Sequence, residues 1–303
     1  MNGIKIASFY SINKMNIILV SVGTFQDYIL TNIKQLLRLH HDQSSIYVIT
    51  DMAFFTHFSE YSGINLIATE SLTDTYIDGY NGKAFLDREW FRDGFWRLTS
   101  ARFFYIRALL ERYNLCNVIH LENDVLIYYN CSTLPLSDET KIYMPFDSYR
   151  RNIASIVYIP NSIVLGRVLD YYNIQMNDME NFALIRQHSP ELIDSLPIFK
   201  NVGLLTDEQQ YVCRNFEKFN IIFDGAAIGQ FLGGIDPRNM SGDTTGFINE
   251  TCVIKYNEYK LYWLTGDDNI SRPFIEIEGI KSPIFNLHIH SKNLERFVHL
   301  ESK

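Results

Sequence analysis

Val118-Ile-His-Leu-Glu122-Asn123-Asp124-Val-Leu-Ile127 places two carboxylates between two short apolar runs. Near-continuous apolar runs are typical of buried strands. Carboxylates are almost never fully buried unless they are paired or bind a metal. Residues i and i+2 of an extended chain point to the same side, so Glu122 and Asp124 are predicted to converge on one hard cation, magnesium or manganese. A solvated strand end is the alternative.

A second polar pattern lies near the C-terminus, in Pro283-Ile-Phe-Asn-Leu-His288-Ile-His290-Ser-Lys292. Three apolar residues alternate with Asn286, His288 and His290, which predicts a strand with one apolar and one polar face. Imidazole is a common ligand for manganese and zinc, and Lys292 can neutralise a phosphate as a point charge. Two histidines on one face make a functional role as plausible as a structural one.

Together the two segments resemble the nucleotide-sugar glycosyltransferases of the GT-A fold. In that family a DxD motif, often with Glu in the first place, ends a strand and binds manganese and the donor diphosphate. Glu122-Asn123-Asp124 is similar to this motif, so the resemblance implies that all three residues lie at the donor. It also implies a metal ligand from a C-terminal histidine that a basic residue follows. His290, with Lys292 after it, is the first choice, and His288 is the alternative.

The segment Leu205-Thr206-Asp207-Glu208-Gln209-Gln210 resembles the acidic segment that opens a helix beside the acceptor sugar in many such enzymes. An inverting reaction needs a base for the incoming hydroxyl, and Glu208 is preferred to Asp207 for this role. In a retaining enzyme the same segment would position the sugar. Acids in a first helical turn, here with Thr206 as the N-cap, are also expected for the helix dipole alone.

The first third of the chain predicts alternating strands and helices. The strand candidates are residues 17–22, 45–50 and 64–68, and residues 27–40 have the spacing of a helix. Strands separated by helices imply an α/β fold with a mostly parallel central sheet flanked by helices. No Gly-x-Gly-x-x-Gly is present, so a dinucleotide fingerprint is absent.

Ligands of such sheets bind outside the carboxyl ends of the strands. The residues at these ends that are predicted to bind the donor are Val22, Gly23, Thr24 and Asp51. Residues 98–112 predict a helix that leads into the acidic pair, and the resemblance implies that an arginine here, Arg102 by preference, also holds the donor. An ion pair with a neighbouring helix or with Asp124 is the alternative for Arg102.

The second half is less regular. Its patterns predict strands at 141–146 and 153–159, helices at 161–172, 179–188 and 207–218, a hairpin of 253–256 with 260–264, and, before them, a long loop at 73–97. The glycine-rich segment 223–237 is either part of the acceptor wall or a tight structural turn.

The resemblance implies a single GT-A catalytic domain over residues 1–303. Residues 14–127 would form the nucleotide-sugar-binding half, and residues 128–285 a smaller mixed region on the acceptor side. Residues 286–303 would form a C-terminal segment that returns to the metal site.

Composition and charge limit the kinds of binding partner and the location that we expect. A net charge of −8 argues against a nucleic-acid partner. No apolar stretch approaches about 18 residues, so no membrane span is expected, although peripheral contact with a membrane stays open. Four widely spaced cysteines fit a reducing compartment. The expected location is the cytoplasm of a microbe, or of a host cell if the gene is viral.

The predicted function is transfer of a sugar from a nucleotide-diphosphate donor, first of all a UDP-sugar, to a glycan, polysaccharide or other hydroxyl acceptor, with Mn²⁺ or Mg²⁺. One alternative is a metal-dependent phosphoester hydrolase that uses Asp124 and the two histidines. Such hydrolases often hold two metals, and acidic or histidine clusters for a second are too few. The other alternative is a non-catalytic nucleotide- or sugar-binding module.

Overall fold

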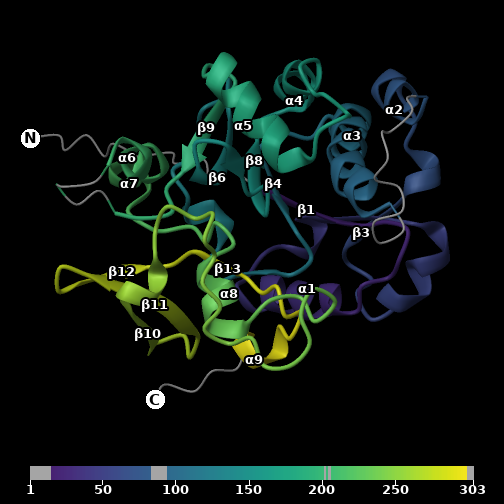
Figure 1. The fold of residues 1–303 in the computed structure, drawn as a ribbon. Helices are drawn as coiled ribbons and strands as arrows, with labels where there is room; N and C mark the ends of the chain where they lie inside the picture. Colours follow the sequence, from purple (N-terminus) through teal and green to yellow (C-terminus); the bar gives the residue numbers. More distant parts are fainter. Residues whose placement is uncertain (1–14, 83–93, 201–202, 204–205, 299–303) are drawn as a thin grey trace, which may run out of the picture.

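A twisted sheet of eight strands forms the centre of the molecule in the computed structural model, which describes residues 15–82, 94–200, 203 and 206–298 (Figure 1). Four strands are parallel and lie in the order β3-β2-β1-β4: β3 Asn65–Ala68, β2 Ile46–Thr50, β1 Asn16–Ser21 and β4 Val118–Leu121. Beyond β4 the order continues through β8 Ile156–Ile159, β6 Ile142–Ser148 and β7 Arg151–Asn152, with antiparallel pairing, while β9 Ile193–Leu196 pairs parallel with β6.

Helices cover both faces of this sheet because the strands are apolar on both sides. Ile17 and Leu19 of β1 pack in one core with Ile29 and Ile33 of α1. Ile18, which points the other way, belongs to the second core, with the opposite helices. These helices are α2 Thr75–Asn81, α3 Phe95–Tyr113, α4 Ser162–Leu169 and α5 Asp178–His188, and α1 is Tyr28–Arg38. The predicted α/β architecture with a mostly parallel central sheet is therefore confirmed.

Two predicted elements differ in the second half. Residues 207–218 form two helices, α6 Asp207–Cys213 and α7 Phe216–Phe219. Between them Asn215 has a φ of 70° and donates its side-chain amide to the carbonyl of Ser195, 2.8 Å away, which ends the first helix. The N-cap was predicted correctly, since Thr206 forms a capping box with Gln209.

Of the hairpin predicted from residues 253–256 and 260–264, only the second strand forms, and it pairs with a later segment. Strand β10 Lys260–Thr265 pairs antiparallel with β11 Ser271–Ile277, and β11 with β12 Ile280–Pro283, which gives a smaller separate sheet. The stretch from Val253 forms bends and no strand, and the Val253 N–H donates to the carbonyl of Asp147 at 2.9 Å. In the predicted loop 73–97, α2 and the start of α3 are helical, and residues 83–93 lie outside the described part.

The C-terminal segment returns to the middle of the chain. Strand β13 Asn286–His288 pairs antiparallel with β5 Val125–Ile127, directly after the acidic pair. Helix α8 Ile228–Gly233 packs on β13, and α9 Glu295–Val298 comes after β13 in the chain (Figure 1). Short 3-10 helices lie at Gln43–Ser45, Met52–Phe58, Thr69–Ser71, Cys131–Thr133 and Tyr256–Glu258. No helix of the described residues is both long enough and apolar enough to span a membrane.

Helix α8 approaches β13 through a glycine. A Cβ at Gly229 would lie 2.1 Å from the carbonyl oxygen of His288, so a side chain is excluded there. The same helix end is held by Asp224, whose carboxylate accepts the N–H groups of Ala227, Ile228 and Gly229 at 2.7–2.9 Å and that of His288 at 2.9 Å. The glycine-rich segment is thus a close packing contact behind the C-terminal strand.

We expect Gly229→Ala to lower stability by about 1–3 kcal/mol, as overpacking of a rigid contact does. Gly79→Ala is the control: a Cβ added to this exposed helical glycine would have no atom within 4 Å, so alanine should stabilise by about 0.5–1 kcal/mol. Urea unfolding of both variants measures the difference. Equal stability of the two would contradict the close contact.

Candidate metal-binding site

Glu122 and Asp124 lie in a tight turn between β4 and β5. The Val125 N–H donates to the carbonyl of Glu122 at 3.0 Å, so the two carboxylates converge through a turn and not along an extended strand as predicted. The fully buried Asn32 of α1 fixes this turn. Its amide donates to the carbonyl of Val125 at 2.8 Å and lies 3.3 Å from those of Glu122 and Asn123.

Asn123 points away from the two carboxylates. Its buried side-chain amide donates to the carbonyl of Val20 at 2.8 Å and to Oε1 of Gln26 at 2.6 Å. It therefore ties the turn to the end of β1. The predicted donor contact of Asn123 stays a prediction, but its side-chain amide is engaged in the protein interior.

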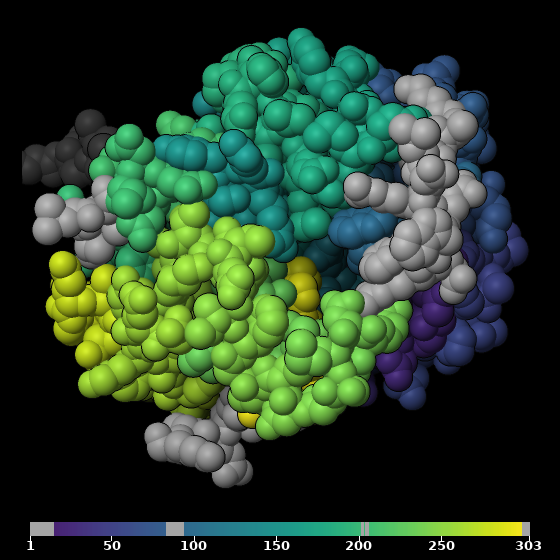
Figure 2. Space-filling model, in the orientation of Figure 1, coloured from purple at the N-terminus to yellow at the C-terminus, as the bar shows by residue number. Residues whose placement is uncertain are grey.

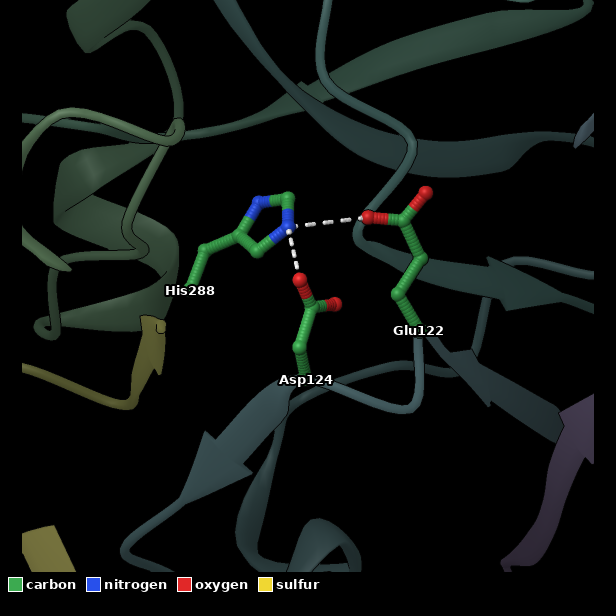
Figure 3. A group of neighbouring side chains, drawn as sticks. All are labelled: Glu122, Asp124 and His288. Carbon is green, nitrogen blue, oxygen red and sulfur yellow. Dashed lines mark ion pairs between the residues drawn. The ribbon is translucent and has the colours of Figure 1, made fainter. Parts of the chain in front are cut away.

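His288 faces both carboxylates (Figure 3). Its Nε2 lies 3.1 Å from Oε2 of Glu122 and 3.3 Å from Oδ2 of Asp124. In the described residues these three side chains form the one group of carboxylate, imidazole and thiol ligands whose donor atoms all lie within 4.8 Å of one another. Two carboxylate oxygens and one imidazole nitrogen are suitable ligands for manganese.

The backbone holds His288 in this position. His288 pairs with Val125 in the register of β13 and β5, and the Ile289 N–H donates to the carbonyl of Asp124 at 2.8 Å. Asp224 accepts the His288 N–H on the other side. The imidazole is therefore positioned by two strands and by the N-terminus of α8.

His288, the alternative choice, contacts the acidic pair, whereas the first choice, His290, lies next to it; which of the two binds a metal stays a prediction. The rings of the two histidines are 4.1 Å apart between centroids, and the side-chain nitrogen of Gln230 lies 3.2 Å from Nδ1 of His290. Alternation along a strand predicted that both histidines share a face, but β13 ends at His288. The chain then leaves the strand direction.

Lys292 contacts the acidic pair from the C-terminal segment. Its Nζ forms an ion pair with Oδ2 of Asp124. Burial alone would raise the pKa of Asp124, but Lys292 and His288 hold this pKa well below its usual range. Burial lowers the pKa of His288, yet Asp124 and Glu122 outweigh it and raise the pKa above its usual value. The cluster therefore keeps its carboxylate charge and attracts positive charge.

Arg102 holds the carboxylate of Glu122 through a buried ion pair. Its buried guanidinium forms ion pairs with Glu122 and, at 2.8 Å, with Asp178 of α5. The structure therefore contains one of the alternatives given for Arg102, an ion pair with a neighbouring helix, through Asp178 of α5. The second ion-pair partner is Glu122 and not Asp124. Sequence analysis missed Asp178, which is 76 residues away from Arg102 and belongs to a helix without a distinctive motif.

The ends of β1 and β2 meet beside this cluster. The Gly23 N–H, at a φ of +81°, donates to Oδ2 of Asp51 at 2.7 Å. The hydroxyl of Thr69 donates to the other oxygen of Asp51, also at 2.7 Å. Val22 is half-buried and Thr24 is exposed. The structure thus joins Gly23 and Asp51, while their predicted contact with a nucleotide stays a prediction.

The two acids predicted to act on the acceptor, Glu208 and Asp207, are not part of this cluster. Glu208, half-buried at the start of α6, accepts the N–H of Tyr149 at 2.9 Å, and Asp207 is exposed. No hydrogen bond or ion pair found among the described residues joins either acid to the cluster of Glu122 and His288. Instead, Glu208 holds the turn between β6 and β7.

The surface is hollowed above the C-terminal segment (Figure 2). In this view the hollow lies between the teal region of α4 and α5 and the yellow-green segment that follows α8, and yellow atoms of the C-terminal segment are visible at its bottom. The C-terminal segment, to which His288 and Lys292 belong, is therefore reached by solvent from this side.

Comparisons with known proteins find only distant structural similarity. No protein-family model and no curated protein matches the sequence. Among solved structures, the chain is similar to the PaToxG glycosyltransferase at 14% identity and a TM-score of 0.36, over 58% of this chain and 70% of that one. It is similar to the glycosyltransferase GlyE of Streptococcus pneumoniae TIGR4 at 15% and 0.37, over 60% of this chain and 45% of that one.

A cytidylyltransferase from Leptospira borgpetersenii is also similar, at 8% identity and a TM-score of 0.35, over 61% of this chain and 76% of that one. The chain spans less than half the length of GlyE. TM-scores below 0.5 do not assign an activity to this chain, which therefore has to be inferred from the chain's own residues.

Another buried acid outside the cluster is Asp147, near the end of β6. Its side chain is fully buried, with Oδ2 3.4 Å from Arg151 and 3.4 Å from the hydroxyl of Thr251. In the described part of the chain, Oδ1 has no hydrogen-bond partner. Burial raises the pKa of Asp147 to about 7, against the opposing charge of Arg151. Sequence analysis missed it because an isolated acid in an apolar strand has no spacing to match.

Since the pKa of Asp147 is raised by folding, its neutral form stabilises the fold at low pH, and this contribution is lost as the pH rises from about 4 through about 7. Asp147→Asn should therefore gain stability relative to the unchanged protein as the pH rises from 4 to 8. Thermal unfolding across this range measures the difference. The exposed Asp267→Asn is the control, and an Asp147→Asn difference as flat as the control's would contradict the raised pKa.

Proposed function

We propose that this chain is a metal-dependent glycosyltransferase that moves a sugar from a nucleotide-diphosphate donor, first of all a UDP-sugar, to a hydroxyl of a glycan or another acceptor. The observation that supports this most directly is the convergence of Glu122, Asp124 and His288 where β4 ends. Open α/β sheets bind ligands outside the carboxyl ends of their strands. The motif resemblance adds the reaction type to this geometry.

In this proposal Glu122, Asp124 and His288 hold Mn²⁺ or Mg²⁺, and the imidazole favours manganese. The bound ion would supply Lewis-acid stabilisation of the negative charge on the departing diphosphate. Lys292 neutralises phosphate charge beside it, and Arg102 keeps Glu122 oriented. The residues proposed to contact the nucleoside are those at the ends of β1 and β2: Val22, Gly23, Thr24 and Asp51.

The histidines give the sharpest test of the metal site. His288→Ala should weaken Mn²⁺ binding by more than the about 10- to 100-fold that loss of a supporting residue costs. His290→Ala, the neighbour on the same segment, should weaken it less, and Asp124→Asn should behave like His288→Ala. Calorimetric titration with Mn²⁺ measures all three, with thermal unfolding in EDTA as the check on folding.

Equal Mn²⁺ affinity of all variants and the unchanged protein would refute the site. A larger loss in His290→Ala than in His288→Ala would restore the histidine order suggested by the sequence. If Mn²⁺ binds but no nucleotide sugar is bound or turned over with any acceptor, a glycosyltransferase activity is excluded and the site has another use.

Glu208 stays our proposed acceptor-side base, with Asp207 as the second candidate, and its contact with Tyr149 allows a sharp test. Glu208→Gln retains an oxygen that can accept the Tyr149 N–H but cannot take a proton. Loss of a base should slow transfer by about 10²–10⁴-fold while donor affinity stays unchanged. Initial rates and UDP-sugar affinity, measured for Glu208→Gln, Glu208→Ala and Asp207→Asn, separate the roles.

If Glu208→Gln transfers at the full rate while Glu208→Ala is slow and unfolds earlier, Glu208 only holds the turn of Tyr149. If only Asp207→Asn is slow, the base is Asp207. Full rates in all three variants would place the base outside this helix.

A further inference from the structure

The last residue of α8, Gly233, lies directly on the C-terminal segment that bears His288 and Lys292. A Cβ at Gly233 would be 3.0 Å from the ring of Phe297 and 3.3 Å from the hydroxyl of Ser291, so glycine permits this contact. Gly234 follows with a φ of +81°, which turns the chain. The turn leads into the yellow-green segment that borders the hollow described above (Figure 2), and this segment contains Ile235-Asp236-Pro237-Arg238.

A buried acid in this segment fixes an exposed guanidinium. Asp236 is 5% exposed, whereas the side chain of Arg238 is 60% exposed. Oδ2 of Asp236 lies 2.9 Å from Nη2 of Arg238, and Oδ1 lies 3.2 Å from Nε and accepts the backbone N–H of Arg238 at 2.8 Å. Guanidinium offers five donors in a rigid fork, so this pairing orients the group while donors remain for a ligand.

Arg238 is electrostatically linked to the metal cluster through Tyr28 of α1. Burial raises the pKa of the Tyr28 phenol, Asp124 raises it further, and Arg238 opposes them. Nζ of Lys292, which contacts Asp124, lies 5.7 Å from the centre of the Tyr28 ring. Arg238 and Asp124 therefore both act on one phenol, and Lys292 lies near that ring and contacts the carboxylate.

We propose that Arg238 is a second cationic contact for the donor diphosphate, which it binds from the segment after α8 while Lys292 binds from the C-terminal segment. This inference rests on the proposed function, because it assumes that a diphosphate binds at the Glu122–His288 cluster. Arginine binds phosphate through paired N–H groups and lysine as a point charge. The two residues would thus provide complementary contacts, and the pairing with Asp236 orients Arg238.

The test uses inorganic pyrophosphate as the probe, because this group is common to every nucleoside diphosphate. Calorimetric titration in Mn²⁺ compares the full-length chain with Arg238→Gln and Arg238→Lys. Hydrogen bonds to charged groups are strong enough that Arg238→Gln should weaken pyrophosphate binding by about 10- to 100-fold, with Arg238→Lys between the two. The affinity for Mn²⁺ alone should not change.

Arg214→Gln is the matched control, since Arg214 is another exposed arginine, 49% exposed, beside a mostly buried aspartate, Asp194. Its pyrophosphate affinity should equal that of the unchanged chain. The proposal is overturned if Arg238→Gln binds pyrophosphate normally, if Arg214→Gln loses as much, or if Arg238→Gln loses Mn²⁺ affinity equally. If the unchanged chain does not bind pyrophosphate with Mn²⁺, the proposed function fails, and this inference fails with it.

Discussion

The pairing of β13 with β5 is the contact on which the candidate site depends. Two segments more than 160 residues apart meet here, since the register opposes His288 to Val125. A strand ladder fixes both direction and register, because a slip by one residue would turn every side chain to the opposite face. The same ladder that buries Leu126 and Leu287 therefore places an imidazole beside Asp124.

Three buried polar side chains hold the residues of the cluster in place. Asn32 binds the backbone of the acidic turn, Arg102 pairs with Glu122 from behind, and Asp224 binds the backbone of His288. Each of these groups would be costly to bury without its partner. Their mutual satisfaction stabilises one arrangement of the carboxylates and the imidazole, and a metal site needs such a supporting shell to orient its ligands.

The sequence predicted the periodic elements and the residue types of the cluster, because strands, amphipathic helices and short motifs are local patterns. The bounds of α1 and the first strands agree with those patterns to within one or two residues. What it could not predict depends on contacts between distant segments: the partner of Arg102, the role of Asp224, and the choice of His288 over His290. The acidic pair converges through a turn that an alternating pattern does not distinguish from a strand.

The distribution of charge explains how cations and carboxylates can share so small a volume. Glu122 pairs with Arg102, Asp124 with Lys292, and Asp236 with Arg238, so each acid has its own base. Of the three bases, Arg102 is buried, whereas Lys292 and Arg238 retain exposure. A divalent ion that bound Asp124 as proposed would compete with Lys292 for Oδ2. Lys292 would then be free to offer its charge to the phosphates of the proposed donor.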